Sequence, residues 1–176
     1  MLIRDLEICN YHSGPFTASN WLVPLLAVGW LEHPQPYTTG LVPDGFDDRL
    51  ELMVNQFRKV YATYNFRGCM ECSICKANGI HLVGPIWSQE NLFIPGDDAV
   101  YVAPGGIVHY IQEHHYLPPE KFIQAVLRCP EVGTVQFGEA LQKANCGCEP
   151  PLESEEKFKH RMIETQKQIF ASRLKA

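Results

Sequence analysis

The sequence lacks a hydrophobic run long enough to cross a membrane. Its longest apolar stretch runs from Trp21 to Trp30 and is interrupted by Pro24, whereas a membrane-spanning helix needs about 20 apolar residues. Residues 1–7 also lack the basic segment that leads into the apolar core and cleavage site of a secretory signal. We therefore expect a cytoplasmic protein that does not associate with membranes.

The chain has no excess of positive charge. Its 176 residues include 15 Lys and Arg against 20 Asp and Glu, which gives a formal net charge of -5. Broad electrostatic attraction to nucleic acid is therefore not expected. With 45% hydrophobic and 20% charged residues, the composition is that of a globular domain with a real core, not of a disordered chain.

Common catalytic motifs are also missing. The sequence contains no HExxH metalloprotease motif, no GxSxG nucleophile elbow, no Walker loop and no GxGxxG dinucleotide motif. The paired motifs of the nucleobase deaminases are absent as well. A non-enzymatic role is therefore favoured, although Glu113, beside His114, keeps a zinc-dependent hydrolase open as an alternative.

Cysteine and histidine, by contrast, are abundant, with seven of each. An odd number of cysteines does not form a closed disulfide framework, and clustered cysteines in a reducing compartment more often bind metal. Cys69, Cys72 and Cys75 form two overlapping CxxC units. A structural zinc site commonly takes two ligands from such a CxxC turn and two from a later helix.

The second pair of ligands is predicted to be His109 and His114. Asn78-Gly79 follows the CxxC unit and favours the turn that would bring the chain back over a metal. In a regular helix, at about 100° per residue, rings five positions apart point about 140° away from each other. We therefore expect the helix to tighten or to end at His114, with loosened or 3₁₀ geometry shortly before Pro118-Pro119.

These motifs together predict a structural Zn²⁺ ion bound by two thiolates and two imidazoles. The predicted ligands are Cys72, Cys75, His109 and His114. Such a site is formally neutral, which lowers the cost of burying it. Alternatives stay open, since His81 or His115 could replace His114 and Cys69 could replace another ligand.

Hydrophobic patterning predicts an α+β fold. Apolar positions three and four apart predict helices over 46–61, 107–116 and 120–129. Strand signals at 81–87, 92–95 and 99–102 predict a small antiparallel sheet. Segments 25–30 and 133–141 each fit a strand or a helix. The expected architecture is a small antiparallel sheet with a treble-clef or zinc-finger-like CxxC…HxxxxH module, packed on several helices.

The C-terminal part of the chain differs in composition from the rest. We predict a zinc-stabilised domain over residues 1–145, a linker over 146–152 and an amphipathic helix over 153–176. The predicted helix carries six Lys and Arg against four Asp and Glu, so it is basic while the preceding chain is acidic. It could dock on its own domain or on a partner. Cys146 and Cys148 lie in the predicted linker, and the sequence assigns them no role.

Three segments carry a resemblance to other proteins. They are VGWL at 28–31, the CxxC unit Cys72–Cys75 and the pattern YxAPxxIxHYIxxHxYxPPxxF over 101–122. Over residues 1–130 the chain resembles a group of small bacterial zinc-binding-like proteins of uncharacterised function. The resemblance implies the same paired positions, at 72 and 75 and at 109 and 114, and it implies no activity.

The function that these observations favour is non-enzymatic. We expect a structural-zinc protein that binds another protein, as an adaptor or as an immunity protein whose acidic surface steers it toward a basic toxin. A nucleic-acid-binding zinc finger is the further alternative, and it is disfavoured because residues 107–116 contain no Lys or Arg. The oligomeric state stays open, since an apolar helix face suits a dimer as well as a docked monomer.

Overall fold

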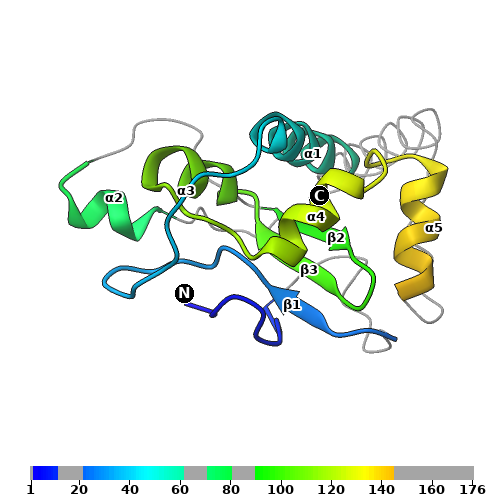
Figure 1. Ribbon diagram of the computed structural model, residues 1–176, viewed down its shortest axis with the longest axis horizontal. Helices are drawn as coiled ribbons and strands as arrows, with labels where there is room; N and C mark the ends of the chain where they lie inside the picture. The colour runs from blue at the N-terminus through cyan, green and yellow to red at the C-terminus, as the bar shows by residue number, and fades with distance from the viewer. Residues whose placement is uncertain (1, 12–21, 62–70, 81–89, 145–176) are drawn as a thin grey trace, which may run out of the picture.

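The computed structural model describes residues 2–11, 22–61, 71–80 and 90–144 (Figure 1). Within these ranges the chain forms a three-stranded sheet and five helices, which confirms the predicted α+β class. The predicted linker, the predicted C-terminal helix and the strand signal at 81–87 lie outside the described residues, as do Cys69 and His81. In the described ranges, no helix combines the length and the apolarity that a bilayer span requires.

The sheet is mixed rather than purely antiparallel. Its strands are β1 (Leu25–Ala27), β2 (Asn91–Pro95) and β3 (Val100–Pro104), in the order β1-β3-β2. The predicted antiparallel pair is confirmed, because β2 and β3 form a hairpin in which Ile94 lies opposite Tyr101. The strand β1 lies parallel to β3, because the chain passes through β2, which is antiparallel to β3, and so returns to the end of the sheet at which β1 also begins.

Three of the five helices in the described ranges agree with the periodic segments of the sequence. They are α1 (Phe46–Val60), α2 (Ser73–Ala77), α3 (Ile107–His114), α4 (Glu120–Arg128) and α5 (Val135–Ala144). The predictions of α1 and α4 are confirmed, and α3 ends two residues earlier than expected. The ambiguous segment 133–141 falls mainly in helix α5, whereas the ambiguous segment 25–30 contains strand β1.

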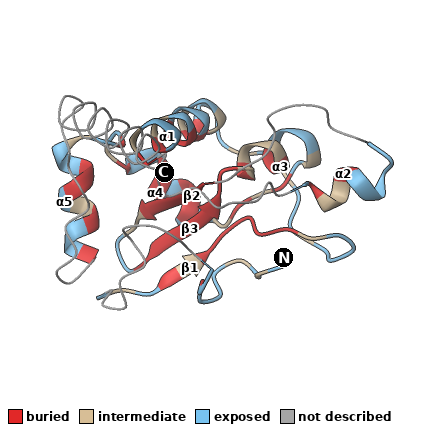
Figure 2. Ribbon diagram, turned by 180° about the vertical axis from the view of Figure 1, so that it is seen from behind, coloured by how far each residue is buried: buried red, intermediate tan, exposed pale blue. Residues whose placement is uncertain are grey.

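The core lies between the sheet and the helices. Strand β3 is buried along its whole length (Figure 2), and α4 and α5 pack against β2 while α1 packs against α3 and α4. Edge-to-face aromatic contacts link these elements: Phe122 of α4 lies 5.9 Å from Tyr101 and 6.4 Å from Phe46, measured between ring centroids. Figures 1 and 2 both place α2 and α3 at one end of the molecule and α5 at the other.

Candidate metal centre

The cysteine pair lies at the start of the short helix α2. Cys72 is the N-cap residue, and its Sγ accepts a hydrogen bond from the Cys75 backbone N–H at 3.4 Å. After the helix, Gly79 turns the chain with a φ of 71°, and the Ile80 N–H donates back to the Cys75 carbonyl at 2.9 Å. Both cysteines are buried, at 6% and 3% exposed, so a tight turn presents two thiols on its inner side.

The histidine pair lies on α3, whose last turn is wider than an α-turn. The His115 N–H donates to the Tyr110 carbonyl five residues back, and the Tyr116 N–H donates to the same oxygen at 3.1 Å. A hydrogen bond over five residues marks a π-type turn, which brings residues five apart closer to one face. The helix then ends at His114, since His115 has a left-handed φ of 52°.

The structure brings the four predicted residues together. His114 Nε2 lies 3.2 Å from the Sγ atoms of both Cys72 and Cys75. His109 Nε2 lies 3.4 Å from the Cys75 Sγ, and the two imidazole rings lie edge to face with centroids 4.9 Å apart. All four ligand atoms lie within 4.8 Å of one another. This Cys2His2 cluster could hold a metal ion.

The separations within the Cys2His2 cluster fit a tetrahedral ion. Zn–S bonds of about 2.3 Å and Zn–N bonds of about 2.0–2.1 Å place S and N ligands about 3.5 Å apart around a tetrahedral centre. Three of the four S···N pairs lie 3.2 to 3.4 Å apart, which is close to this value. A metal of this geometry therefore needs little rearrangement of the four side chains.

Burial shapes the protonation of the metal-free cluster. It raises the pKa of the Cys75 thiol to about 11, with a further contribution from Cys72, and it lowers the pKa values of His109 and His114. Both imidazoles are thus neutral at pH 7 and can donate a lone pair to a metal. The thiols would have to lose their protons to become ligands, so binding a divalent metal would release protons.

Two contacts outside the cluster position the histidine helix. Ahead of it, Gly29 lies so close to Ile107, the first residue of α3, that a Cβ at position 29 would meet the Ile107 side chain at 2.8 Å. Beyond it, the buried hydroxyl of Tyr116 donates to the Asp5 carboxylate at 2.8 Å, and this carboxylate also accepts from the Gly29 N–H at 2.9 Å. Gly29 and Asp5, both in the N-terminal part of the chain, therefore hold α3 in place at its two ends.

Sequence reasoning missed these positioning residues. A lone glycine in the apolar run from Leu25 to Leu31 is the signal that points to Gly29, since a glycine there suggests a close approach of two segments. Asp5 and Tyr116 are 111 positions apart in the sequence. No local sequence pattern therefore indicates their hydrogen bond.

The alternative ligands fare differently. His115 is exposed and does not belong to the cluster found among the residues that the structure describes. Cys69 and His81 lie outside those residues, so a role of either as a ligand in place of one of the four stays a prediction.

His109 also lines a cavity of about 310 Å³ together with Glu113 and Arg58. The Arg58 Nε donates to the buried Glu90 carboxylate at 2.6 Å. Of the four residues of the cluster, His109 is the one that lines this cavity.

The fold and the cluster define the class of protein: a small α+β domain whose CxxC turn and helix α3 assemble a potential Cys2His2 metal site. A family model matches residues 1–127, and the chain belongs to this family, which is described as a domain of unknown function (DUF7919). The matched range includes all four residues of the cluster and ends within α4. No curated protein and no solved structure matches the chain.

Proposed function

We propose that the chain is a zinc-stabilised, non-catalytic domain that acts by binding another protein in the cytoplasm. The observation that carries the zinc assignment is the convergence of two thiols and two imidazoles within 4.8 Å. This donor set is typical of structural Zn²⁺, because zinc favours four-coordinate sites with sulfur and nitrogen ligands. A reducing compartment would keep both thiols available.

The donor count supports a structural role for this metal. A catalytic zinc ion keeps one coordination position for water or substrate and has three protein ligands. Four protein ligands at Cys72, Cys75, His109 and His114 would fill a tetrahedral shell. The metal would then fix α2 against the end of α3.

Elemental analysis of the untagged full chain tests the metal. We expect about one zinc per chain in the wild type, as for a single structural site, and little zinc in Cys72→Ser. Cys146→Ser is the matched control, because it removes a thiol from the predicted linker, and it should keep its zinc. Co²⁺ substitution gives a second readout, since tetrahedral thiolate coordination produces visible absorption bands that Cys72→Ser should lose. Folded wild-type protein without metal would contradict the proposal.

The proposed partner is a basic protein, as expected for an adaptor or an immunity protein against a basic toxin. The net charge of -5 supports this choice, because complementary charge steers association. Asp48 and Glu51 add a local argument, since these exposed carboxylates lie three positions apart in the first turns of α1 and therefore share one face.

A capture experiment with charge variants tests the partner. The full chain is immobilised, proteins from the source cells are captured, and each candidate is then purified and titrated against the wild type. We expect a basic protein whose binding weakens in Asp48→Lys/Glu51→Lys and at ionic strengths of about 1 M, where the Debye length falls to about 3 Å. A partner that binds this variant as tightly as the wild type would contradict the role of the acidic face, and retention of nucleic acid alone would favour the nucleic-acid-binding alternative.

A further inference from the structure

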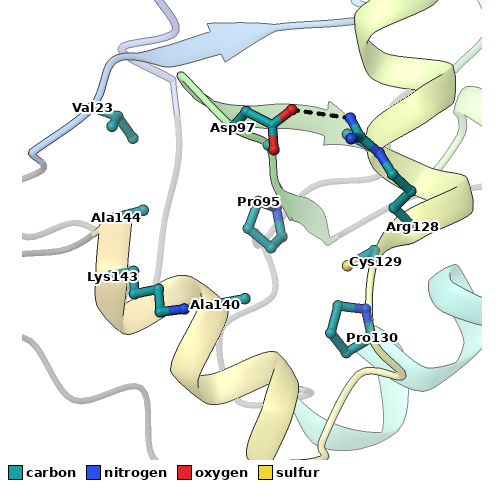
Figure 3. A pocket seen from close by; sticks show the side chains of 11 residues that line it. Val23, Pro95, Asp97, Arg128, Cys129, Pro130, Ala140, Lys143 and Ala144 are labelled. Carbon is teal, nitrogen blue, oxygen red and sulfur yellow. Dashed lines mark hydrogen bonds and ion pairs between the residues drawn. The ribbon is translucent and has the colours of Figure 1, made fainter.

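A second cavity lies at the end of the molecule opposite the Cys2His2 cluster. It has a volume of about 380 Å³ and is enclosed by the turn between β2 and β3, the end of α4 and the last two turns of α5 (Figure 3). Small-molecule sites have volumes of about 300–1,000 Å³. None of its lining residues belongs to the Cys2His2 cluster, so an occupant of this cavity would be independent of the metal.

The walls of this cavity are small and apolar. Ala125 of α4 and Ala140 and Ala144 of α5 face the space, and Pro95 and Pro130 close it from two sides. Alanine ends at Cβ, so three alanines on two facing helices leave room that larger side chains would fill. The buried Cys129 thiol also points toward this space in Figure 3, and its pKa, raised by burial to about 12, keeps it uncharged at pH 7. These walls suit the hydrocarbon part of a ligand.

Two cations lie at the same cavity. Arg128 donates to the Asp97 carboxylate at 3.1 Å and to the Gln124 carbonyl at 3.2 Å, and a guanidinium has five N–H donors, so further donors remain for a ligand. Lys143 forms no salt bridge with the residues that the structure describes. Asp97, whose carboxylate pairs with Arg128, also lines the cavity, so Arg128 and Lys143 together with Asp97 leave the lining with a net charge of +1, whereas the chain as a whole carries -5.

We propose that this cavity binds a small organic carboxylate. The carboxylate group would lie between Arg128 and Lys143, and its hydrocarbon body would contact the alanine and proline walls. A cationic ligand is disfavoured by the net positive charge of the lining side chains.

Titration of the full chain with octanoate tests this proposal, with octylammonium as the ligand of opposite charge. Binding is followed by calorimetry and by the NMR shifts of the alanine methyl groups. Ala140→Phe fills the cavity, and Lys143→Gln removes one cation from it. Lys121→Gln is the matched control, because Lys121 is an exposed cation that pairs with Asp98 at 2.9 Å and does not line the cavity.

We expect saturable binding of octanoate to the wild type and to Lys121→Gln. Binding should weaken by about tenfold or more in Lys143→Gln and in Ala140→Phe, which corresponds to a loss of at least about 1.4 kcal/mol. The melting curve of Ala140→Phe establishes that this variant is folded, and Lys143→Gln tests the same site without changing the packing. Equal binding of octylammonium, unchanged binding in both cavity variants, or no saturable binding of octanoate would overturn the proposal.

Discussion

The substitution Gly29→Ala tests how the N-terminal segment positions the histidine helix. Gly29 has a φ of +74°, and a Cβ there would lie 2.8 Å from both Cγ1 and Cδ1 of Ile107. A left-handed backbone costs an alanine about 1–2 kcal/mol, and overpacking of a filled core typically costs a further 1–3 kcal/mol, roughly. We therefore expect Gly29→Ala to lower the free energy of unfolding by about 2–5 kcal/mol.

A second glycine separates the two contributions. Gly45 has a similar φ of +78°, but a Cβ there would meet nothing within 4 Å. The variant Gly45→Ala therefore carries the backbone cost alone, about 1–2 kcal/mol. Urea unfolding of both variants, with and without metal, gives the difference between them, which measures the contact with Ile107.

The contact at Gly29 should also affect metal binding. Ile107 precedes His109 by two residues on the same helix, so a displaced Ile107 shifts one imidazole relative to the CxxC turn. We expect Gly29→Ala, but not Gly45→Ala, to weaken the affinity for Zn²⁺ in a competition titration with a chelator. Equal stabilities and equal affinities of the two variants would refute the argument that Gly29 positions α3.

Three further predictions concern the Cys2His2 cluster itself. His114→Ala should lose Zn²⁺ and its tetrahedral Co²⁺ spectrum, whereas His115→Ala, at the exposed neighbouring position, should keep both. In the metal-free protein, burial holds the pKa of His109 below 6.5 and raises that of Cys75 from 9.0 to about 11. Below pH 6.5 the unfolded state therefore binds more protons than the folded state, through His109, and above pH 9.0 it binds fewer, through Cys75. The free energy of unfolding, measured in urea, should fall as the pH is lowered below 6.5 and as it is raised above 9.0. Removal of the metal with a chelator should speed hydrogen exchange at the amides of residues 73–80, while the amides of β3 stay protected. An equal loss of protection in both segments would contradict a local effect of the metal on α2.

The four residues of the candidate site could be predicted because both pairs leave a local signal. The CxxC unit and the histidines five positions apart are each visible within a short segment, and zinc chemistry connects the two pairs. The expected end of the helix at His114 is confirmed, and the last turn of α3 is loosened rather than tightened to 3₁₀ geometry. Helix α1 was predictable for a similar reason, because its buried residues repeat at three and four positions.

Features that depend on distant contacts could not be predicted. The parallel pairing of Leu26 with Tyr101 joins segments 75 positions apart, and the segment around Leu26 is too short for its period to separate strand from helix. Helix α5 was ambiguous because Gly138 interrupts its apolar pattern, and its place becomes clear only when Phe137 packs on Phe57 of α1 at 5.7 Å. In each case the tertiary partner decides the local structure.

The way α2 is attached explains why a metal would matter locally rather than globally. Helix α2 has five residues, too few to be stable on its own, and Cys75 is the one among them that is buried. Apart from the cluster, a hydrogen bond from the His33 N–H to the Ser73 hydroxyl, at 2.9 Å and exposed, joins α2 to the rest of the described chain, and the partly buried Ile74 packs against the hydrophobic core. The sheet and helices α1, α4 and α5 supply most of this core. Metal-binding energy at the cluster would therefore act mainly on the attachment of α2 to α3, while most core contacts would persist without the metal.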